Sequence, residues 1–209
     1  MIRAASPAEP LRVAVLVSGQ GTNLQALLDR FGAGSPVRVV AVAASRAGVP
    51  ALDRARRAGV EGGVFPRGDD REARDGALAR WLEERGVELA VLAGFMELLT
   101  PAFLDRIPAI NVHPALLPAF PGLDGVGEAL RHGVRVTGVT VHLVDAGLDT
   151  GPVLLQEAVP VHYDDTVESL HERLRPVEHR LLAEAVQALA QNRVGVEGRR
   201  VSISPVEDG

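Results

Sequence analysis

The feature that most constrains the fold is a repeated alternation between short apolar runs and segments with helical periodicity. Residues 11–17 (LRVAVLV) and 37–45 (VRVVAVAAS) are nearly continuous apolar runs of strand length. Such runs are typical of strands buried on both faces of a parallel sheet. Between them, residues 22–31 carry leucines at helical spacing. The sequence therefore predicts βαβ units and an α/β fold with a mostly parallel sheet.

The same alternation continues along the chain. Further strands are expected at 60–65, 87–92, 109–113, 134–144 and 153–161, and helices at 50–58, 71–85, 101–106 and 166–191. The strand at 134–144 alternates in a way that predicts one wetter face. Pro176 is expected to kink or split the last helix. The tail, 194–204, is expected to form a small hairpin or an edge strand.

Three helix starts carry capping signals. Asp70 is the expected N-cap of the helix that begins at residue 71. Thr22 with Gln25 makes a capping-box pattern, and Asp165 with Glu168 is expected to start the last helix.

Composition narrows the class of protein. The chain has 209 residues, 46% of them hydrophobic, with a net charge of −5 and no cysteine. Disulfides, thiolate nucleophiles and cysteine-zinc sites are thereby excluded. No basic run indicates a nucleic-acid partner, and the apolar runs are too short to span a bilayer. Residues 1–10 have no apolar core like that of a signal peptide and are expected to be a disordered lead. We therefore expect a soluble, cytoplasmic protein with one domain of two lobes.

The first candidate site is the turn SGQGTN, residues 18–23, between the first strand and the first helix. Its glycines allow a tight turn and a close approach of the backbone to a ligand. The first N–H groups of a helix lack internal partners and favour an anion. No GK[ST] follows, and Leu24 occupies the third position of a dinucleotide fingerprint, so a single phosphate is favoured over a pyrophosphate. The alternative is a turn that only connects strand and helix.

The second candidate site is the segment INVHPALLPAFPG, residues 110–122. Alternation along a strand puts Asn111 and His113 on one face, roughly 6–7 Å apart. Ligands of open α/β sheets bind beyond the carboxyl ends of strands. An amide and a protonated imidazole there can stabilise an oxyanion. The alternative is that both side chains satisfy the loop backbone.

The third candidate site is the loop in VHLVDAGLDTGPVL, residues 141–154. Asp149 near His113 would favour the imidazolium and relay protons through water. The alternative is a turn aspartate that binds its own backbone. His142 either faces the site or is an ordinary buried histidine. His171, in the last helical region, is expected to be solvated or structural. A parallel sheet would bring the ends of these two segments to one rim.

Four segments taken together resemble the phosphoribosylglycinamide formyltransferases, the folate-dependent formyltransferases of purine synthesis. They read VLVSGQGTNLQALL, LAGFMELLTPAFL, INVHPALLPAFPGL and TGVTVHLVDAGLDTGPVLLQ, in the family's order, and the similarity extends over about residues 11–190. The resemblance implies a Rossmann-like sheet. It also implies transfer of a formyl group from 10-formyltetrahydrofolate, a co-substrate, to the amine of glycinamide ribonucleotide in de novo purine biosynthesis. No tightly bound cofactor and no metal are implied.

The resemblance also implies site residues. Asn111, His113 and Asp149 match the family's catalytic positions. Positions implied to contact the ribonucleotide are Gly21, Thr22, Asn23, Arg175, Pro176, Val177 and Glu178. Positions implied to contact folate are Arg71, Met96, Glu97, Leu98, Leu99, Asn111, Asp145, Ala146, Gly147, Leu148 and Asp149. The bond between Leu117 and Pro118 is expected to be cis.

The resemblance implies one formyltransferase domain over residues 11–209. Its first half, 11–108, would bind the phosphate and ribonucleotide, and its second, 109–209, would hold the catalytic and folate sites. The expected partners are small molecules, with no nucleic acid or membrane, in a monomer or homodimer.

The sequence departs from the family at four positions. Glu97 stands where many relatives carry a basic residue, which removes a positive charge beside the folate pterin. Asp124 replaces a usual His, Gly127 a common Arg, and Arg175 a familiar Gln. These departures put details of substrate contact in question, and not the catalytic positions.

Three other functions compete with this interpretation. The first is a formyltransferase for another amine acceptor, although a tRNA enzyme is expected to carry an added basic domain. The second is a metal enzyme using His113, His142 and Asp149. The third is a non-catalytic sensor of phosphate ligands, which burial of Asn111 and His113 away from any cleft would favour.

Overall fold

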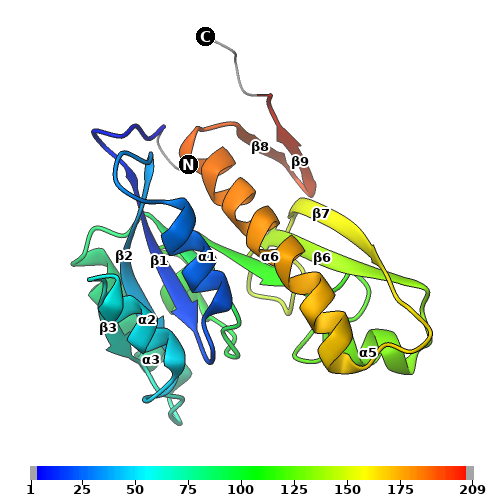
Figure 1. Ribbon diagram of the computed structural model, residues 1–209. Helices are drawn as coiled ribbons and strands as arrows, with labels where there is room; N and C mark the ends of the chain where they lie inside the picture. Colours follow the sequence, from blue (N-terminus) through cyan, green and yellow to red (C-terminus); the bar gives the residue numbers. More distant parts are fainter. Residues whose placement is uncertain (1–3, 206–209) are drawn as a thin grey trace.

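The computed structural model describes residues 4–205 and shows one sheet with helices on both faces (Figure 1). The sheet has seven strands in the order β3-β2-β1-β4-β5-β6-β7. Neighbouring strands from β3 to β5 are parallel, whereas β6 pairs antiparallel with β5 and with β7. The predicted α/β fold with a mostly parallel sheet is confirmed. Residues 1–3 of the expected disordered lead, and 206–209 of the expected domain, lie outside the described residues.

The strands lie close to the predicted ranges. They are β1 (Leu11–Val17), β2 (Val37–Ala44), β3 (Glu61–Val64), β4 (Leu89–Leu92), β5 (Ala109–His113), β6 (Val136–Leu143) and β7 (Val153–Pro160). The predicted wetter face of β6 is wrong, because residues 137–142 are all buried. Helix α6 packs against β6, and the loop after β5 also covers it, with Leu117 N–H donating to Thr140 Oγ1 at 3.1 Å.

The helices also lie close to the predicted ranges, except for a short helix at 125–131 that was not predicted. They are α1 (Thr22–Arg30), α2 (Pro50–Arg57), α3 (Arg71–Glu83), α4 (Pro101–Leu104), α5 (Gly125–Arg131) and α6 (Val167–Ala190). Of the two predicted effects of Pro176, the split is wrong, because α6 runs unbroken through the proline, and the kink stays a prediction. Leu174 before the proline and Leu181 after it are both buried. Packing of both halves on the sheet offsets the loss of one backbone hydrogen bond.

The structure corrects two of the three predicted caps. Asp70 caps α3 as expected, since its Oδ1 accepts from Ala73 N at 2.8 Å. The N-cap of α1 is Gly21, without a side-chain cap, so Thr22 is the first helical residue and its predicted capping box with Gln25 is wrong. The chain enters α1 from a left-handed turn, which places Thr22 one position too late to cap.

The last helix begins one residue later than predicted. Thr166 is the N-cap of α6 and forms a capping box with Ser169. Asp165 does not cap the helix with Glu168. Its carboxylate accepts from Arg173 Nη1 at 2.6 Å instead, and this contact holds the pKa of Asp165 well below its usual range.

The sheet separates two cores. In β1, Val13 and Val15 belong to the core shared with α1, α2 and α6, whereas Ala14 and Leu16 belong to the core shared with α3 and α4. This alternation confirms the prediction of a strand buried on both faces. A separate hairpin, β8 (Val194–Glu197) with β9 (Arg200–Ile203), confirms the prediction for the tail and contacts β7 (Figure 1). Among residues 4–205, no helix combines the length and hydropathy that a bilayer crossing needs.

Candidate active site

A cleft of about 710 Å³ lies at the carboxyl ends of the parallel strands. Its walls come from the turn after β1, the loop after β4, the end of β5 and the loops that follow β5 and β6. Open α/β sheets bind ligands at this edge, because loops from several strands converge there. All three candidate segments of the sequence contribute to the cleft.

Asn111, His113, His142 and Asp149 converge on one wall of the cleft. Asn111 Nδ2 donates to Asp149 Oδ1 at 3.3 Å and lies 3.1 Å from His142 Nε2. His113 Nδ1 lies 3.5 Å from Asp149 Oδ2. Both histidines are almost fully buried. An amide and an imidazole from one strand thus meet a carboxylate that lies 38 residues beyond Asn111 in the chain.

Asp149 is held in its charged form by its neighbours. Burial by itself raises the pKa of a carboxyl group. Hydrogen bonding with His142, the hydrogen bond from Gly122 N–H at 2.7 Å and the nearby charge of His113 outweigh that effect, so the pKa of Asp149 lies below its ordinary value. The site therefore contains a carboxylate that stays ionised at neutral pH.

The loop after β5 orients the catalytic candidates. His113 Nε2–H donates to Phe120 O at 2.7 Å, which leaves Nδ1 directed toward Asp149. His142 Nδ1–H donates to Leu143 O at 2.8 Å, which turns its Nε2 toward Asn111 Nδ2, at 3.1 Å, and Asp149 Oδ1, at 3.5 Å. The peptide bond between Leu117 and Pro118 in this loop is cis.

The segments 110–122 and 141–154 meet, but not because their strands are parallel and end at the same rim, as the sequence predicted. Because β6 runs antiparallel to β5, its carboxyl end points away from the rim formed by the carboxyl ends of the parallel strands. His142 instead pairs directly with Asn111, and the loop after β6 folds over so that Asp149 reaches both Asn111 and His113. The expectation of parallel strand ends on one rim is therefore wrong for β6.

The turn before α1 forms the opposite end of the cleft. Gly21, Thr22 and Asn23 all line it. Gly21 has φ 71°, and a Cβ built there would lie 2.6 Å from Ala51 Cβ. Asn23 Nδ2 donates to Glu178 Oε2 at 3.0 Å, and both side chains are buried. The first turn of α1 and the middle of α6 thus meet at one place.

The segment 175–178 contributes one residue to the cleft. Glu178 lines it, whereas Arg175, Pro176 and Val177 do not. Because the segment is helical, its side chains point in different directions, and Val177 packs on the core instead.

Most of the positions implied to contact folate line the remaining wall of the cleft. Arg71, Met96, Glu97, Leu98, Leu99, Asn111, Asp145, Gly147, Leu148 and Asp149 line the cleft, and Ala146 does not. Met96, Leu98, Leu123 and Leu148 are large apolar side chains that remain exposed there. This part of the cleft suits a flat apolar ligand.

The carboxylate of Glu97 lies beside a buried arginine in the wall of the cleft. Its Oε2 lies 3.3 Å from Nη1 of the buried Arg74, which also pairs with Asp75 at 2.6 Å. Arg74 and Arg71 both donate to Leu98 O, at 3.2 and 3.1 Å. Glu97 therefore shares the positive charge of Arg74 with Asp75.

Two other departures form a single local motif. Asp124 is the N-cap of α5 and accepts from Gly127 N at 3.2 Å. A Cβ at position 127 would overlap the Asp124 carboxylate, so the glycine makes room for the cap.

Sequence reasoning missed several residues of the cleft. His171, expected to be solvated or structural, lines the cleft with its Nε2 3.8 Å from Glu178 Oε1. Phe120 and Gly122 orient the catalytic candidates through backbone atoms. Arg46 and Arg67 also line the cleft. The helical spacing of His171 and Glu178 on α6 was a usable signal, whereas backbone contacts leave none in the sequence. In the part of the chain that the structure describes, no three His, Asp or Glu side chains are arranged to hold a metal ion.

The sheet, its flanking helices and the cleft at its strand ends define a Rossmann-like α/β enzyme. The formyl transferase family profile matches residues 11–186. The chain is 47% identical over 201 residues to phosphoribosylglycinamide formyltransferase of Mycobacterium tuberculosis strain H37Rv, covering 94% of this chain and 93% of that one. The chain belongs to the formyl transferase family, among its phosphoribosylglycinamide formyltransferases.

Other relatives agree. A crystal structure of glycinamide ribonucleotide transformylase 1 from Symbiobacterium toebii has a TM-score of 0.88 at 48% identity, covering 93% of this chain and 94% of that one. The trifunctional purine biosynthetic protein adenosine-3 of Gallus gallus is 43% identical over 191 residues, which are 89% of this chain and 19% of that protein. The fold and the sequence thus point to the same family.

Proposed function

We propose that this chain transfers the formyl group of 10-formyltetrahydrofolate to the amine of glycinamide ribonucleotide in de novo purine biosynthesis. The names of the relatives support the reaction, and one observation supports the site: Asn111, His113 and Asp149 converge on the wall of a single cleft. The turn at 21–23 and Glu178 would hold the ribonucleotide at one end. The apolar wall would hold the folate at the other.

The reaction forms one C–N bond and breaks another. The substrate amine attacks the formyl carbon, and the carbonyl oxygen becomes an oxyanion. The intermediate then breaks the bond to N10 of the folate, which leaves as tetrahydrofolate after taking up a proton. The amine loses one proton in the process, so the balance requires a relay from the amine to N10.

The contacts of the three residues suit these roles. In the structure, Asn111 Nδ2 donates to Asp149 at 3.3 Å. When the oxyanion forms, the amide donates to the oxyanion instead of to Asp149. His113 donates to the oxyanion from Nδ1, because its Nε2–H already donates to Phe120 O. Asp149, kept ionised, stabilises the charged His113 and accepts the amine proton through water. Holding both substrates in one cleft supplies a further share of the rate.

The test is a formyl-transfer assay with purified protein, glycinamide ribonucleotide and 10-formyltetrahydrofolate, comparing His113→Ala with His162→Ala. His162 is exposed and lies outside the cleft. We expect His113→Ala to lower kcat by about 10²–10³ or more, the loss typical of one oxyanion donor. His162→Ala is expected to retain wild-type turnover. Wild-type turnover by His113→Ala would refute the assigned role, and an inactive wild-type protein would refute the reaction.

A further inference from the structure

The C-terminal hairpin lies outside the segment matched by the family profile, which ends at residue 186. The turn of the hairpin nevertheless contacts the loop between β6 and β7, which carries Asp149 and is called the active-site loop below. Arg199, in the turn between β8 and β9, donates from Nη1 to Thr150 O at 2.8 Å. Thr150 directly follows Asp149. The hairpin therefore contacts the loop one residue from a catalytic candidate.

The loop between β6 and β7 needs such support. Asp149 has φ 53°, a left-handed conformation that costs a non-glycine residue about 1 kcal/mol or more. Within the loop, Asp145 Oδ1 accepts from Gly147 N at 3.0 Å and from Thr150 Oγ1 at 2.6 Å. Much of the loop is exposed, including Leu148. Contacts of this kind hold the strained loop in place, together with the hydrogen bonds that the Asp149 carboxylate accepts from Gly122 and Asn111.

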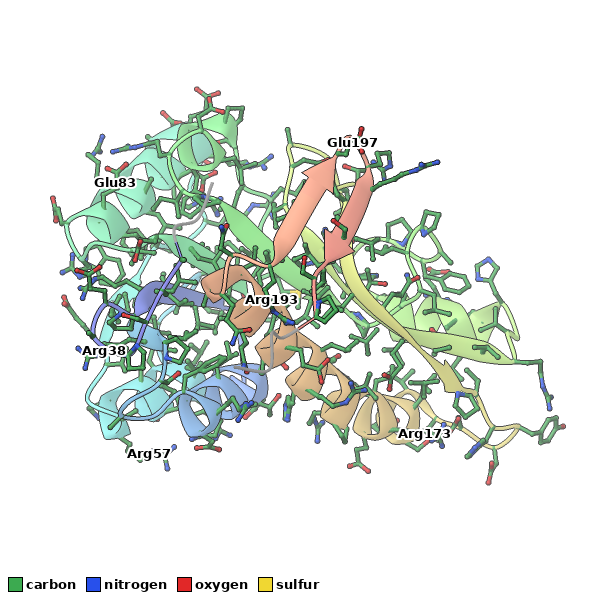
Figure 2. All side chains as sticks on the ribbon, turned by 90° about the horizontal axis from the view of Figure 1, so that it is seen from above. Arg38, Arg57, Glu83, Arg173, Arg193 and Glu197 are labelled. Atoms are coloured by element: carbon green, nitrogen blue, oxygen red, sulfur yellow. The ribbon has the colours of Figure 1, made fainter. Side chains whose placement is uncertain are left out.

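The hairpin itself is firmly attached to the domain. Val194 and Val201 pack against the larger core. Arg193 and Ser204 close its base with two hydrogen bonds, from Arg193 Nη1 to Ser204 O at 2.8 Å and from Ser204 N to Arg193 O at 3.0 Å. Figure 2 shows Arg193 and Glu197 at the two ends of β8, with the turn projecting beyond Glu197. The turn between β8 and β9 is thus held in a fixed position and can support the loop between β6 and β7.

We propose that Arg199 is a positioning residue, through which the C-terminal hairpin braces the active-site loop and holds the Asp149 carboxylate against Asn111 and His113. The inference rests on the proposed function in that Asp149 must serve catalysis. The bond between Arg199 and Thr150 restricts the backbone next to Asp149. That restriction maintains the contact of Asp149 Oδ2 with Gly122 N at 2.7 Å.

The test compares Arg199→Ala, Arg199→Lys and the control Arg200→Ala. Arg200 is the exposed neighbour of Arg199 in β9, so its removal changes the same charge on the same hairpin. We expect Arg199→Ala to lower kcat by about three- to tenfold, the effect of one ordinary hydrogen bond. The KM for the ribonucleotide should stay within about twofold, because the phosphate turn lies at the other end of the cleft. Arg199→Lys should restore most of the loss.

Hydrogen exchange provides a readout that does not depend on activity. In Arg199→Ala, the amides of residues 144–151 and of Gly122 should exchange faster than in the wild type, and in Arg200→Ala at the wild-type rate. Unchanged exchange and kcat in Arg199→Ala, or an equal loss in Arg200→Ala, would overturn the proposal. If Arg199→Ala fails to fold, Arg199→Gln and Arg199→Lys decide it by the same measurements. An inactive wild type with the expected exchange pattern would refute the proposed reaction and leave the brace supported.

Discussion

Substitution of Gly21 by alanine tests whether the turn before α1 requires glycine. The residue has φ 71°, and its Cβ would lie 2.6 Å from Ala51 Cβ and 2.9 Å from Ala51 Cα. Carbon atoms in contact are normally about 3.5–4.0 Å apart. Both Ala51 atoms belong to rigid parts of α2, so neither can rotate away. The turn or α2 must therefore move.

The expected cost follows from these two effects. A left-handed conformation costs an alanine about 1–2 kcal/mol, and overpacking of this kind adds about 1–3 kcal/mol. Lower entropy of the unfolded chain offsets about 0.4–1 kcal/mol. We therefore expect Gly21→Ala to lower the free energy of unfolding by about 1–4.6 kcal/mol, with the centre of the range near 3 kcal/mol. Urea unfolding measures this change directly.

Gly19 in the same turn is the matched control. A Cβ at Gly19 meets nothing within 4 Å. Gly19→Ala should leave the free energy of unfolding unchanged or raise it by up to about 1 kcal/mol, because only the entropy of the unfolded chain changes. In calorimetric titration, Gly21→Ala should also bind glycinamide ribonucleotide more weakly, because the N–H groups of Thr22 and Asn23 shift. Equal stability of the two variants would refute the steric argument.

Three further predictions concern other parts of the molecule. Asp149 has a lowered pKa, so its contribution to stability is present above the ordinary value near 4 and is lost as pH falls through the folded-state pKa. The difference in unfolding free energy between wild type and Asp149→Asn should accordingly shrink below about pH 4, and a constant difference would contradict this. Thr166→Ala removes the N-cap of α6 and should cost about 1 kcal/mol in urea unfolding. Phe103→Ala empties a fully buried position on α4 and should cost about 3–5 kcal/mol by the same assay, whereas a value under about 1 kcal/mol would show that the core refills the space.

The sequence by itself determined most of the elements, because their signals are local. The strand at Ala109–His113 was predicted to the residue, and the Asp70 cap of α3 was identified from its position before a periodic segment. The side-by-side placement of Asn111 and His113 also follows from strand alternation alone. The N-cap of α6 could not be assigned from the sequence, because the neighbours Asp165 and Thr166 are both residue types that cap helices. The structure distinguishes them, because Arg173 binds the Asp165 carboxylate and Thr166 caps the helix.

The tertiary structure decided how the site is assembled. Asn23 and Glu178 are 155 residues apart and meet only because α1 and α6 pack on the same face of the sheet. Because β6 is antiparallel to β5, Asp149 reaches His113 only through the loop after β6, and pairing direction is not encoded in the apolar pattern of either strand. Local periodicity reports which face of an element is buried. Long-range packing decides which partner covers that face. Backbone groups also take part, such as the Gly122 N–H that donates to Asp149, and a backbone donor leaves no signal in the identity of its residue.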